Sequence, residues 1–342
     1  MQQIHSLYDF FALSGADVRL YHMGRRISPC TLDTLSDFEK GEIAWPVPWQ
    51  GQARLAMLFR LGDMEDPLIW FLAFPLDEQG HLEPALRDAF LERLLDILGR
   101  NAEAVAAGNA SDVDNLMKDN PLAFPPSLTF QAMLHAHASH DLGLPASEHL
   151  EPVEAFFTGQ GSQDWRALGL QGLADYVARL EAETRDALIA RLPKLHNNAL
   201  VSLCYCLEHA HIDNELAEAI RQRGEQQARQ GDIEGFCACI RAIGNAGAAA
   251  CNWFDALLGD SNACGPDALV AMAARGWEHL EDGKRLPLYL ERVAQCEQAD
   301  FLAVARDLAM IPRLRLPVLM TLRQADQDSI IGQRLRQVRN QQ

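Results

Sequence analysis

The strongest constraint on the fold of this chain is a sequence pattern that recurs every 33 to 36 residues. Four short segments share a mixture of apolar and small residues, and they lie at 198–204, 234–240, 267–273 and 300–306. The apolar residues that set the interval are Leu200, Phe236, Leu269 and Leu302. A period of this length with two helices per unit is typical of an α-solenoid, in which each helix pair buries its apolar face against the next. The sequence therefore predicts a helical repeat domain.

A weaker helical pattern follows each of these segments, and a looser copy of the repeat begins at Trp165. The second helices of the pairs are expected at 185–192, 214–223, 252–258, 286–293 and 316–322. We therefore predict a HEAT-like α-solenoid of about five helix pairs over residues 163–342. The amphipathic segment 330–338 either caps the last repeat or extends from it as a tail.

The first hundred residues have a different pattern, in which helical periodicity alternates with β-rich runs. Helices are expected at 3–14, 31–40 and 84–98, and strands at 18–22, 25–27, 53–61 and 68–76. The residues between the last two runs, 62–67, are typical of a hairpin connection. We therefore predict a small α+β domain over residues 1–100, within a chain that is mainly α.

A change in composition marks the end of this domain. Residues 101–112 are small and polar, and residues 120–126 contain three prolines. Two helices are expected after this boundary, at 128–141 and 147–158. We assign residues 101–162 to a linker with two connecting helices that leads into the repeats.

The charge of the chain is strongly negative and unevenly distributed. The net charge is −17, and residues 1–162 carry 23 Asp and Glu against 10 Lys and Arg, a balance of −13. A surface of that sign repels phosphate backbones, which argues against nucleic-acid binding. The longest strongly apolar run, Leu68–Phe74, is too short to cross a bilayer, and residues 1–8 show no signal-peptide pattern. We expect a cytoplasmic protein that binds neither nucleic acids nor membranes.

The eight cysteines lie mostly inside helical patterns, which favours free thiols in a reducing compartment. Two pairs, Cys204 with Cys206 and Cys237 with Cys239, suggest a metal site at first sight. Residues two apart on a helix point about 200° apart, however, so neither pair can chelate one ion. Cys204 and Cys239 also align with apolar positions of the repeat, and we expect both to pack in the core.

One stretch is rich in histidine, with His135, His137 and His140 followed by Asp141. The last three of these residues share a helix face and carry side chains that metal ions accept as ligands. No further ligand follows at a characteristic spacing, so we interpret the stretch as solvated or hydrogen-bonded. The sequence also lacks the motifs of zinc proteases, α/β-hydrolases and phosphate-binding loops. We therefore predict no catalytic residue, no metal and no cofactor.

The candidate partner-binding residues lie on a proline-rich loop and on the second helices of the repeats. The candidates are Trp45, Trp49, Glu215, Glu218, Asp255 and Glu291. The two tryptophans form either an aromatic docking patch or a cover for the edge of the strand pair. The acidic residues are candidates because second helices line the concave surface of many solenoids. Trp253 and Tyr289 lie on the same helices, either as exposed anchors or buried between repeats.

Three short strings carry a resemblance to a known family. They are Met-Gly-Arg-Arg-Ile-Ser-Pro at 23–29, Gly-Leu-Pro-Ala-Ser at 143–147 and Trp-Arg-Ala-Leu-Gly-Leu-Gln-Gly-Leu-Ala-Asp at 165–175. These strings resemble an uncharacterised family of bacterial proteins, catalogued as a domain of unknown function, and the likeness covers nearly the whole chain. The resemblance implies no activity, cofactor or catalytic residue, and it implies a bacterial cytosolic protein.

These observations favour a non-catalytic adaptor or scaffold whose helical-repeat surface binds a protein partner. The acidic N-terminal half favours a basic partner, because opposite charge steers association. The alternative is an enzyme or small-ligand-binding protein with a site between the α+β domain and the repeats, near Trp49, His137 and Asp141. A third hypothesis, nucleic-acid binding through Arg334 and Arg336, is opposed by the overall charge. The oligomeric state is open.

Overall fold

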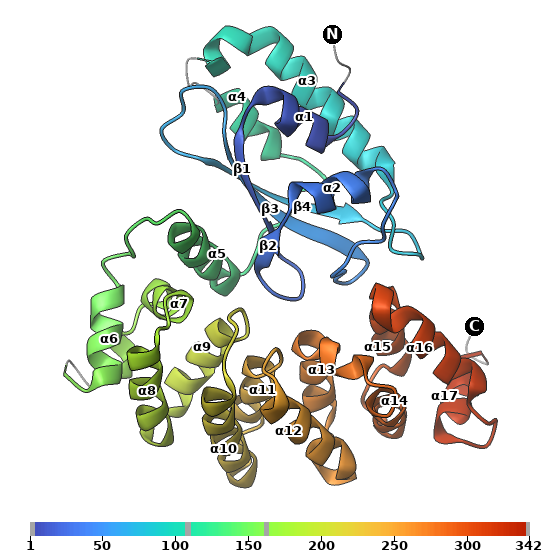
Figure 1. The fold of residues 1–342 in the computed structure, drawn as a ribbon. Helices are drawn as coiled ribbons and strands as arrows, with labels where there is room; N and C mark the ends of the chain where they lie inside the picture. The colour runs from blue at the N-terminus through green and yellow to red at the C-terminus, as the bar shows by residue number, and fades with distance from the viewer. Residues whose placement is uncertain (1–3, 107–110, 161–163, 340–342) are drawn as a thin grey trace. The chain divides into compact units, whose positions relative to one another are not determined.

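The computed structural model describes residues 4–106, 111–160 and 164–339, and it divides into two compact units. The first unit contains residues 1–126 and 310–312, and the second contains residues 127–309 and 313–342. The described chain is mostly helical, with a four-stranded antiparallel sheet in the first unit (Figure 1). The mainly helical character and the small N-terminal α+β unit agree with the sequence prediction.

In the first unit the strands are β1 (Asp17–His22), β2 (Ser28–Cys30), β3 (Gln52–Arg60) and β4 (Leu68–Pro75). The helices are α1 (Leu7–Ser14), α2 (Leu32–Glu39), α3 (Pro84–Ala106), α4 (Ser111–Asp114) and the 3₁₀ turn η1 (Asn115–Met117). The sheet order is β2-β1-β3-β4, and every neighbouring pair is antiparallel. This order arises because β3 and β4 form the predicted hairpin and β1 pairs with the free side of β3.

An aromatic row joins the sheet to its helices. Phe59 of β3 lies between Phe11 of α1, at 5.2 Å between ring centroids, and Trp70 of β4, at 4.6 Å. Trp70 in turn contacts Phe90 of α3 at 5.3 Å. All four rings are buried, and their edge-on packing is the arrangement that aromatic pairs prefer. Helices α1 and α3 are therefore held on the same face of the sheet.

The first unit extends beyond the predicted boundary at residue 100. That position falls inside α3, and Val113, Leu116 and Leu122 are buried in the same core as the sheet. The backbone N–H of Ala73 also donates a hydrogen bond to the carbonyl of Leu122 at 2.8 Å. Residues 111–126 therefore pack with the α+β unit instead of forming a linker.

The second unit is entirely helical over its described residues. Its α-helices are α5 (Leu128–Asp141), α6 (Leu150–Thr158), α7 (Leu170–Ala178), α8 (Ala182–Arg191), α9 (Asn197–Leu207), α10 (Asn214–Gln230), α11 (Ile233–Ala242), α12 (Ala248–Gly259), α13 (Pro266–Arg275), α14 (Arg285–Gln295), α15 (Phe301–Met310), α16 (Pro312–Gln324) and α17 (Ile330–Arg339). Its 3₁₀ turns are η2 (Trp165–Ala167), η3 (Leu192–Lys194), η4 (Ser261–Ala263) and η5 (Trp277–Glu281).

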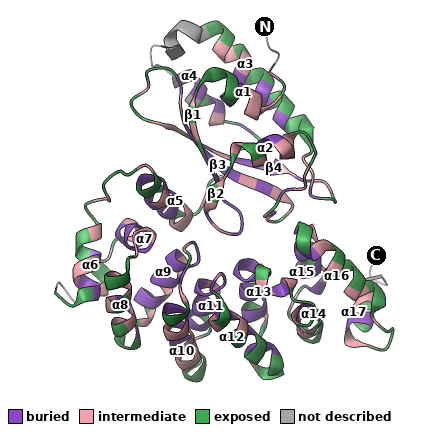
Figure 2. Ribbon diagram, viewed as in Figure 1, coloured by how far each residue is buried: buried purple, intermediate pink, exposed green. Residues whose placement is uncertain are grey.

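These helices form two rows. Helices α5, α7, α9, α11 and α13 contact one another in that order, and α6, α8, α10, α12 and α14 form the second row. The repeat residues Leu200, Phe236 and Leu269 are buried on α9, α11 and α13, where buried positions are concentrated (Figure 2). Leu302 is half-buried, and Phe301 takes the core position in α15. The recurring pattern thus marks buried residues of successive first-row helices.

Burial decides two further sequence interpretations. Cys204 and Cys239 are fully buried, and their Sγ atoms lie 4.0 Å apart across the contact between α9 and α11. Trp253 and Tyr289 are also buried, so they pack inside the second unit instead of forming exposed anchors. The expectation that the two cysteines are small core residues is confirmed.

Candidate functional site

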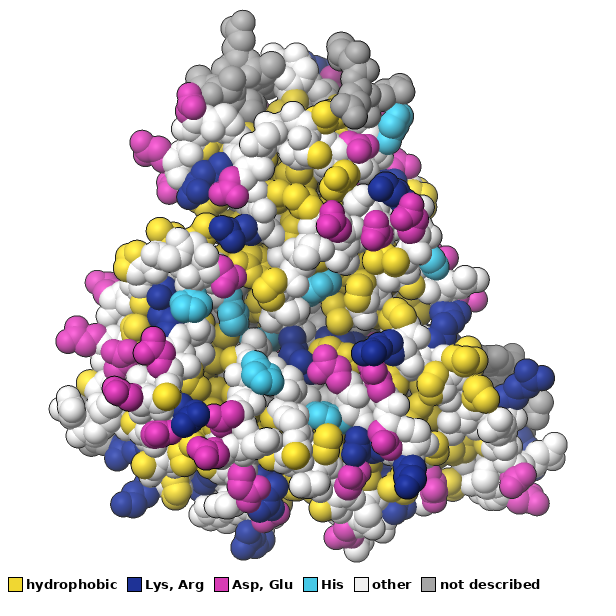
Figure 3. Space-filling model, in the orientation of Figure 1, with side chains coloured by type: hydrophobic (Ala, Val, Ile, Leu, Met, Phe, Trp, Pro, Cys, Tyr) yellow, Lys and Arg dark blue, Asp and Glu magenta, His cyan; other side chains and the backbone are white. Residues whose placement is uncertain are grey.

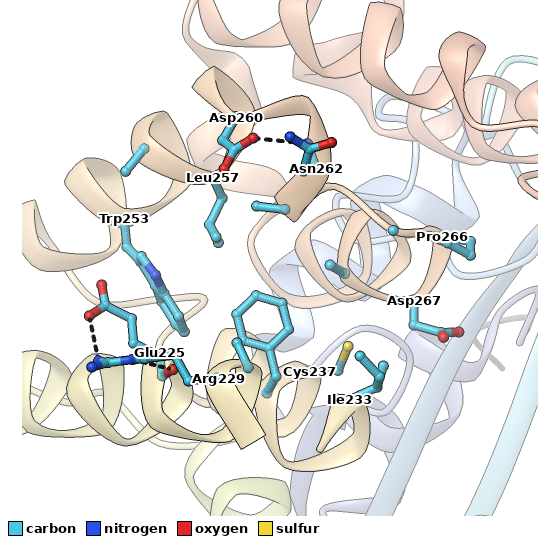
Figure 4. Close-up of a pocket in the computed structure, with 16 residues that line it drawn as sticks. Glu225, Arg229, Ile233, Cys237, Trp253, Leu257, Asp260, Asn262, Pro266 and Asp267 are labelled. Atoms are coloured by element: carbon cyan, nitrogen blue, oxygen red, sulfur yellow. Dashed lines mark hydrogen bonds and ion pairs between the residues drawn. The ribbon is translucent and has the colours of Figure 1, made fainter. Parts of the chain in front are cut away.

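A groove of about 910 Å³ opens in the second unit between two successive helix pairs, α10–α11 and α12–α13 (Figure 4). The groove lies beside the turn between α10 and α11. It also borders the segment that connects α12 to α13 through η4. Its lining residues are Glu225, Ala228, Arg229, Ile233, Phe236, Cys237, Trp253, Ala256, Leu257, Asp260, Asn262, Ala263, Gly265, Pro266, Asp267 and Ala268.

The floor of the groove is apolar. The rings of Phe236 and Trp253 meet edge-on at 5.9 Å, and Leu257 of the next turn lies beside them. Ile233, the first residue of α11, is 53% exposed although it borders this floor. This side chain extends the apolar lining of the groove to the surface of the second unit.

The rim of the groove carries a net negative charge. Its ionisable side chains are Glu225, Arg229, Asp260 and Asp267. Arg229 interacts with Glu225, at 3.6 Å between Nη2 and Oε2, so these two charges offset each other. Asp260 accepts a hydrogen bond from the backbone N–H of Asn262 at 2.9 Å, and Asp267 is exposed at the start of α13. Two carboxylates are left to attract a cationic group.

Small residues keep the groove open. Ala228, Ala256, Ala263 and Ala268 line it where larger side chains would fill the space. On the adjacent turn of α10, a Cβ added at Gly224 would lie 2.6 Å from Cη2 of Trp253. The absence of a side chain at position 224 therefore lets the indole lie against α10 and form the wall of the groove.

A buried ion cluster ties together the ends of three first-row helices. Glu208, which follows the last residue of α9, accepts hydrogen bonds from Arg241 of α11 at 2.6 and 2.8 Å. Arg275 of α13 lies 2.8 Å from the same carboxylate. Burial raises the pKa of Glu208, but the charges and hydrogen bonds of the two arginines outweigh burial and lower it to about 2. Because both guanidiniums are engaged by one carboxylate, the cluster is a structural joint.

The histidines beside this joint are held neutral. Burial lowers the pKa of His209 to about 3, against the opposing effect of Glu208. Burial also lowers the pKa of His137 on α5, although Asp141 acts in the opposite direction. Phe130 of α5 packs edge-on against His209 at 4.6 Å. Within the described residues, no group of three or more His, Cys, Asp or Glu side chains is arranged to hold a metal ion.

The residues that the sequence suggested for partner binding belong to both units. Trp45 is fully buried in the first unit, where it packs edge-on against Phe38 at 4.8 Å. This burial contradicts the docking interpretation of Trp45, because a side chain without exposed surface cannot contact a partner. Trp49 is half-buried, and the guanidinium of Arg25 lies 5.3 Å from its ring.

The four acidic candidates lie on second-row helices outside the groove. Glu215 and Glu218 are on α10, Asp255 is on α12 and Glu291 is on α14. Glu215 lies near Arg185, and Glu218 pairs with Arg221. Asp255 pairs with Arg285, and Glu291 accepts a hydrogen bond from Gln295. Glu218 and Asp255 are therefore paired with arginines, whereas Glu291 contacts a neutral amide and Glu215 shares Arg185 with Asp186 and Asp213.

Sequence reasoning missed most of the residues that form the groove, above all Ile233 and Asp267, and it considered Trp253 only as a possible anchor. The available signal was weak, because an isoleucine directly after the N-cap Asp232 has the pattern of any amphipathic helix start. The groove depends on how four helices pack, which a linear pattern does not encode.

The comparisons with known proteins identify a family. The family model for a protein of unknown function, DUF3549, matches residues 2–338. No curated protein matches the chain, and no solved structure matches it. Across the part of the chain that the structure describes, no helix has both the length and the apolar character needed to span a membrane. Because the match covers almost the full sequence, the chain belongs to the DUF3549 family of proteins of unknown function.

Proposed function

We propose that this protein is a non-catalytic adaptor that binds a segment of another protein in the groove between α10–α11 and α12–α13. The observation that supports this proposal is the combination of an open apolar floor with a net negative rim. Ile233, which is 53% exposed, offers most of the apolar contact area next to Leu257, and Asp260 and Asp267 lie beside it (Figure 4). An amphipathic segment with an apolar anchor next to Lys or Arg fits both properties.

The architecture that presents the groove is, in this proposal, a HEAT-like α-solenoid. The two rows of mutually contacting helices and the burial of the repeat residues support it. Solenoids of this kind form extended binding surfaces from neighbouring repeats, and the groove lies between two adjacent helix pairs.

The compartment that we propose is the cytoplasm. All eight cysteines are free thiols, including Cys204 and Cys239, whose Sγ atoms lie 4.0 Å apart without a bond. Free thiols persist where the surroundings are reducing. On the face drawn in Figure 3, the coloured residues show acidic and basic side chains interspersed, an arrangement that supports a protein partner better than a nucleic acid.

The test is photo-crosslinking at two positions of the full chain. A photoreactive amino acid at Ile233 samples the groove, and the same residue at Val270, which is 50% exposed on α13 but does not line the groove, is the matched control. In cytosol of the source cell, we expect a defined partner to be crosslinked from position 233 and not from position 270. The crosslinked peptide should contain an apolar residue next to Lys or Arg. Identical products from both positions, or none from position 233, would refute the proposal.

A further inference from the structure

A cysteine and a histidine from different helices meet away from the groove. The Sγ of Cys251, in the second turn of α12, lies 3.3 Å from Nδ1 of His279 in η5. Both residues are half-buried, so the sulfur is neither sealed in the core nor fully exposed. In the tautomer with its proton on Nε2, the imidazole accepts a hydrogen bond from the thiol. A nucleophile in contact with a base is the minimal arrangement that activates a thiol.

The neighbouring residues fix this pair in place. Arg285 of α14 donates a hydrogen bond to the backbone carbonyl of His279 at 2.7 Å. The same guanidinium donates two hydrogen bonds to Asp255, at 2.7 and 3.0 Å, one helical turn beyond Cys251. Phe254 packs edge-on against the imidazole at 5.3 Å. His279 is thus held at its backbone by Arg285 and at its ring by Phe254.

Arg285 also lies close to the pair. Its pKa is raised chiefly by the hydrogen bond to Asp255, and the charge of Cys251 contributes in the same direction. The cluster therefore places a proton acceptor 3.3 Å from the thiol, beside an arginine that is paired with Asp255.

From this geometry we infer that Cys251 is a reactive thiol, activated by His279, that forms mixed disulfides with small disulfide molecules. The proton of the thiol passes to Nδ1 of His279, and the thiolate attacks one sulfur of the small disulfide. A bond forms between Cys251 and that sulfur as the original disulfide bond breaks. The second sulfur leaves as a thiolate and takes the proton from His279. The exchange conserves electrons, and a thiol of the same small molecule reverses it.

The other cysteines provide internal comparisons. Burial raises the pKa of the thiols of Cys30 and Cys206 to about 12, and burial chiefly raises those of Cys237 and Cys264 to about 11. Cys237 is the reference for the rate, because it is half-buried like Cys251 and borders the open groove.

The experiment exposes the full reduced chain to oxidised glutathione at neutral pH and follows each cysteine by peptide mass spectrometry. We expect Cys251 to be modified at least about tenfold faster than Cys237. His279→Asn keeps a polar group near the sulfur but removes the base, and it should slow the modification of Cys251 by a similar factor. His135→Asn, at an exposed histidine of α5, is the matched control and should have no effect.

The dependence of the rate on pH separates activation from a structural effect. In the parent protein the rate at Cys251 should follow two titrating groups, and in His279→Asn it should follow one. If Cys251 reacts no faster than Cys237 in the parent protein, the inference is wrong, and this comparison needs no variant to fold. An unchanged rate in a folded His279→Asn protein would equally overturn it.

Discussion

At the scale of single residues, the carboxylate of Glu208 is a buried charge that holds two arginines. It interacts with both Arg241 and Arg275, so one acid compensates two bases from two other helices. Pairs of this kind contribute little net stability relative to apolar packing, but breaking one is costly because charge is left buried without compensation. The contribution of Glu208 to the free energy of unfolding is therefore best measured by replacing this residue.

We predict that Glu208→Gln lowers the free energy of unfolding by about 3–5 kcal/mol, because the amide cannot neutralise the two guanidiniums. Urea denaturation followed by circular dichroism measures this loss. Glu218→Gln is the control: its pair with Arg221 is partly exposed, so its loss should stay below about 1 kcal/mol. Equal losses in the two variants would contradict the structural role of Glu208.

The same cluster predicts a loss of stability in acid. The pKa of His209 is about 3 against an ordinary value of 6.5, and that of Glu208 is about 2 against 4.5. Both values are lower in the folded chain, so the unfolded chain binds more protons as the pH falls. The free energy of unfolding should decrease below pH 6.5 through His209, and below pH 4.5 through Glu208 as well. In urea titrations, Glu208→Gln should lack the component below pH 4.5, and a parallel decline in both proteins there would exclude Glu208 as its source.

At the scale of helices, the groove depends on a close approach between α10 and α12. A methyl group at Gly224 would lie 2.6 Å from Trp253 and 3.0 Å from the Cβ of Cys239. We expect Gly224→Ala to displace the indole, shift the tryptophan fluorescence and lower the thermal midpoint, despite the higher helix propensity of alanine. Gly259→Ala, at the end of α12, has no neighbour within 4 Å and should be neutral or stabilising. A stabilised Gly224→Ala protein would show that this contact does not hold the wall of the groove.

The elements were largely predictable, whereas the site was not. The recurring apolar residues Leu200, Phe236 and Leu269 marked three core helices because helical periodicity is a local property of the sequence. Trp45 was misjudged as a docking candidate because its neighbouring prolines resemble an exposed loop, yet its backbone N–H donates a hydrogen bond to the carbonyl of Gly80 at 2.8 Å and its ring packs in the core. The groove was missed because Gly224 and Trp253 acquire their roles only when two helix pairs stack.

At the scale of the whole molecule, the net charge of −17 favours association with cationic partners, and the groove adds a local negative rim. We predict that the double variant Asp260→Lys and Asp267→Lys weakens binding of the crosslinked partner segment by about tenfold or more and reduces the salt dependence of its association. Glu297→Lys with Asp307→Lys makes the same change in net charge outside the groove. Calorimetry at two salt concentrations compares them, and equal effects would show that overall charge, not the rim, selects the partner.

The joint at Glu208 also has a consequence for how the array opens. In a stack whose units touch only their neighbours, each unit can fray separately. A single carboxylate here links α9 to α11 and also to α13, two positions along the row. Opening α9 leaves Arg275 buried without its carboxylate, and opening α11 or α13 removes one of the two guanidiniums that lower the pKa of Glu208. Their slowest amide protons should therefore exchange with solvent at one common free energy, so that the middle of the array behaves as a single cooperative unit.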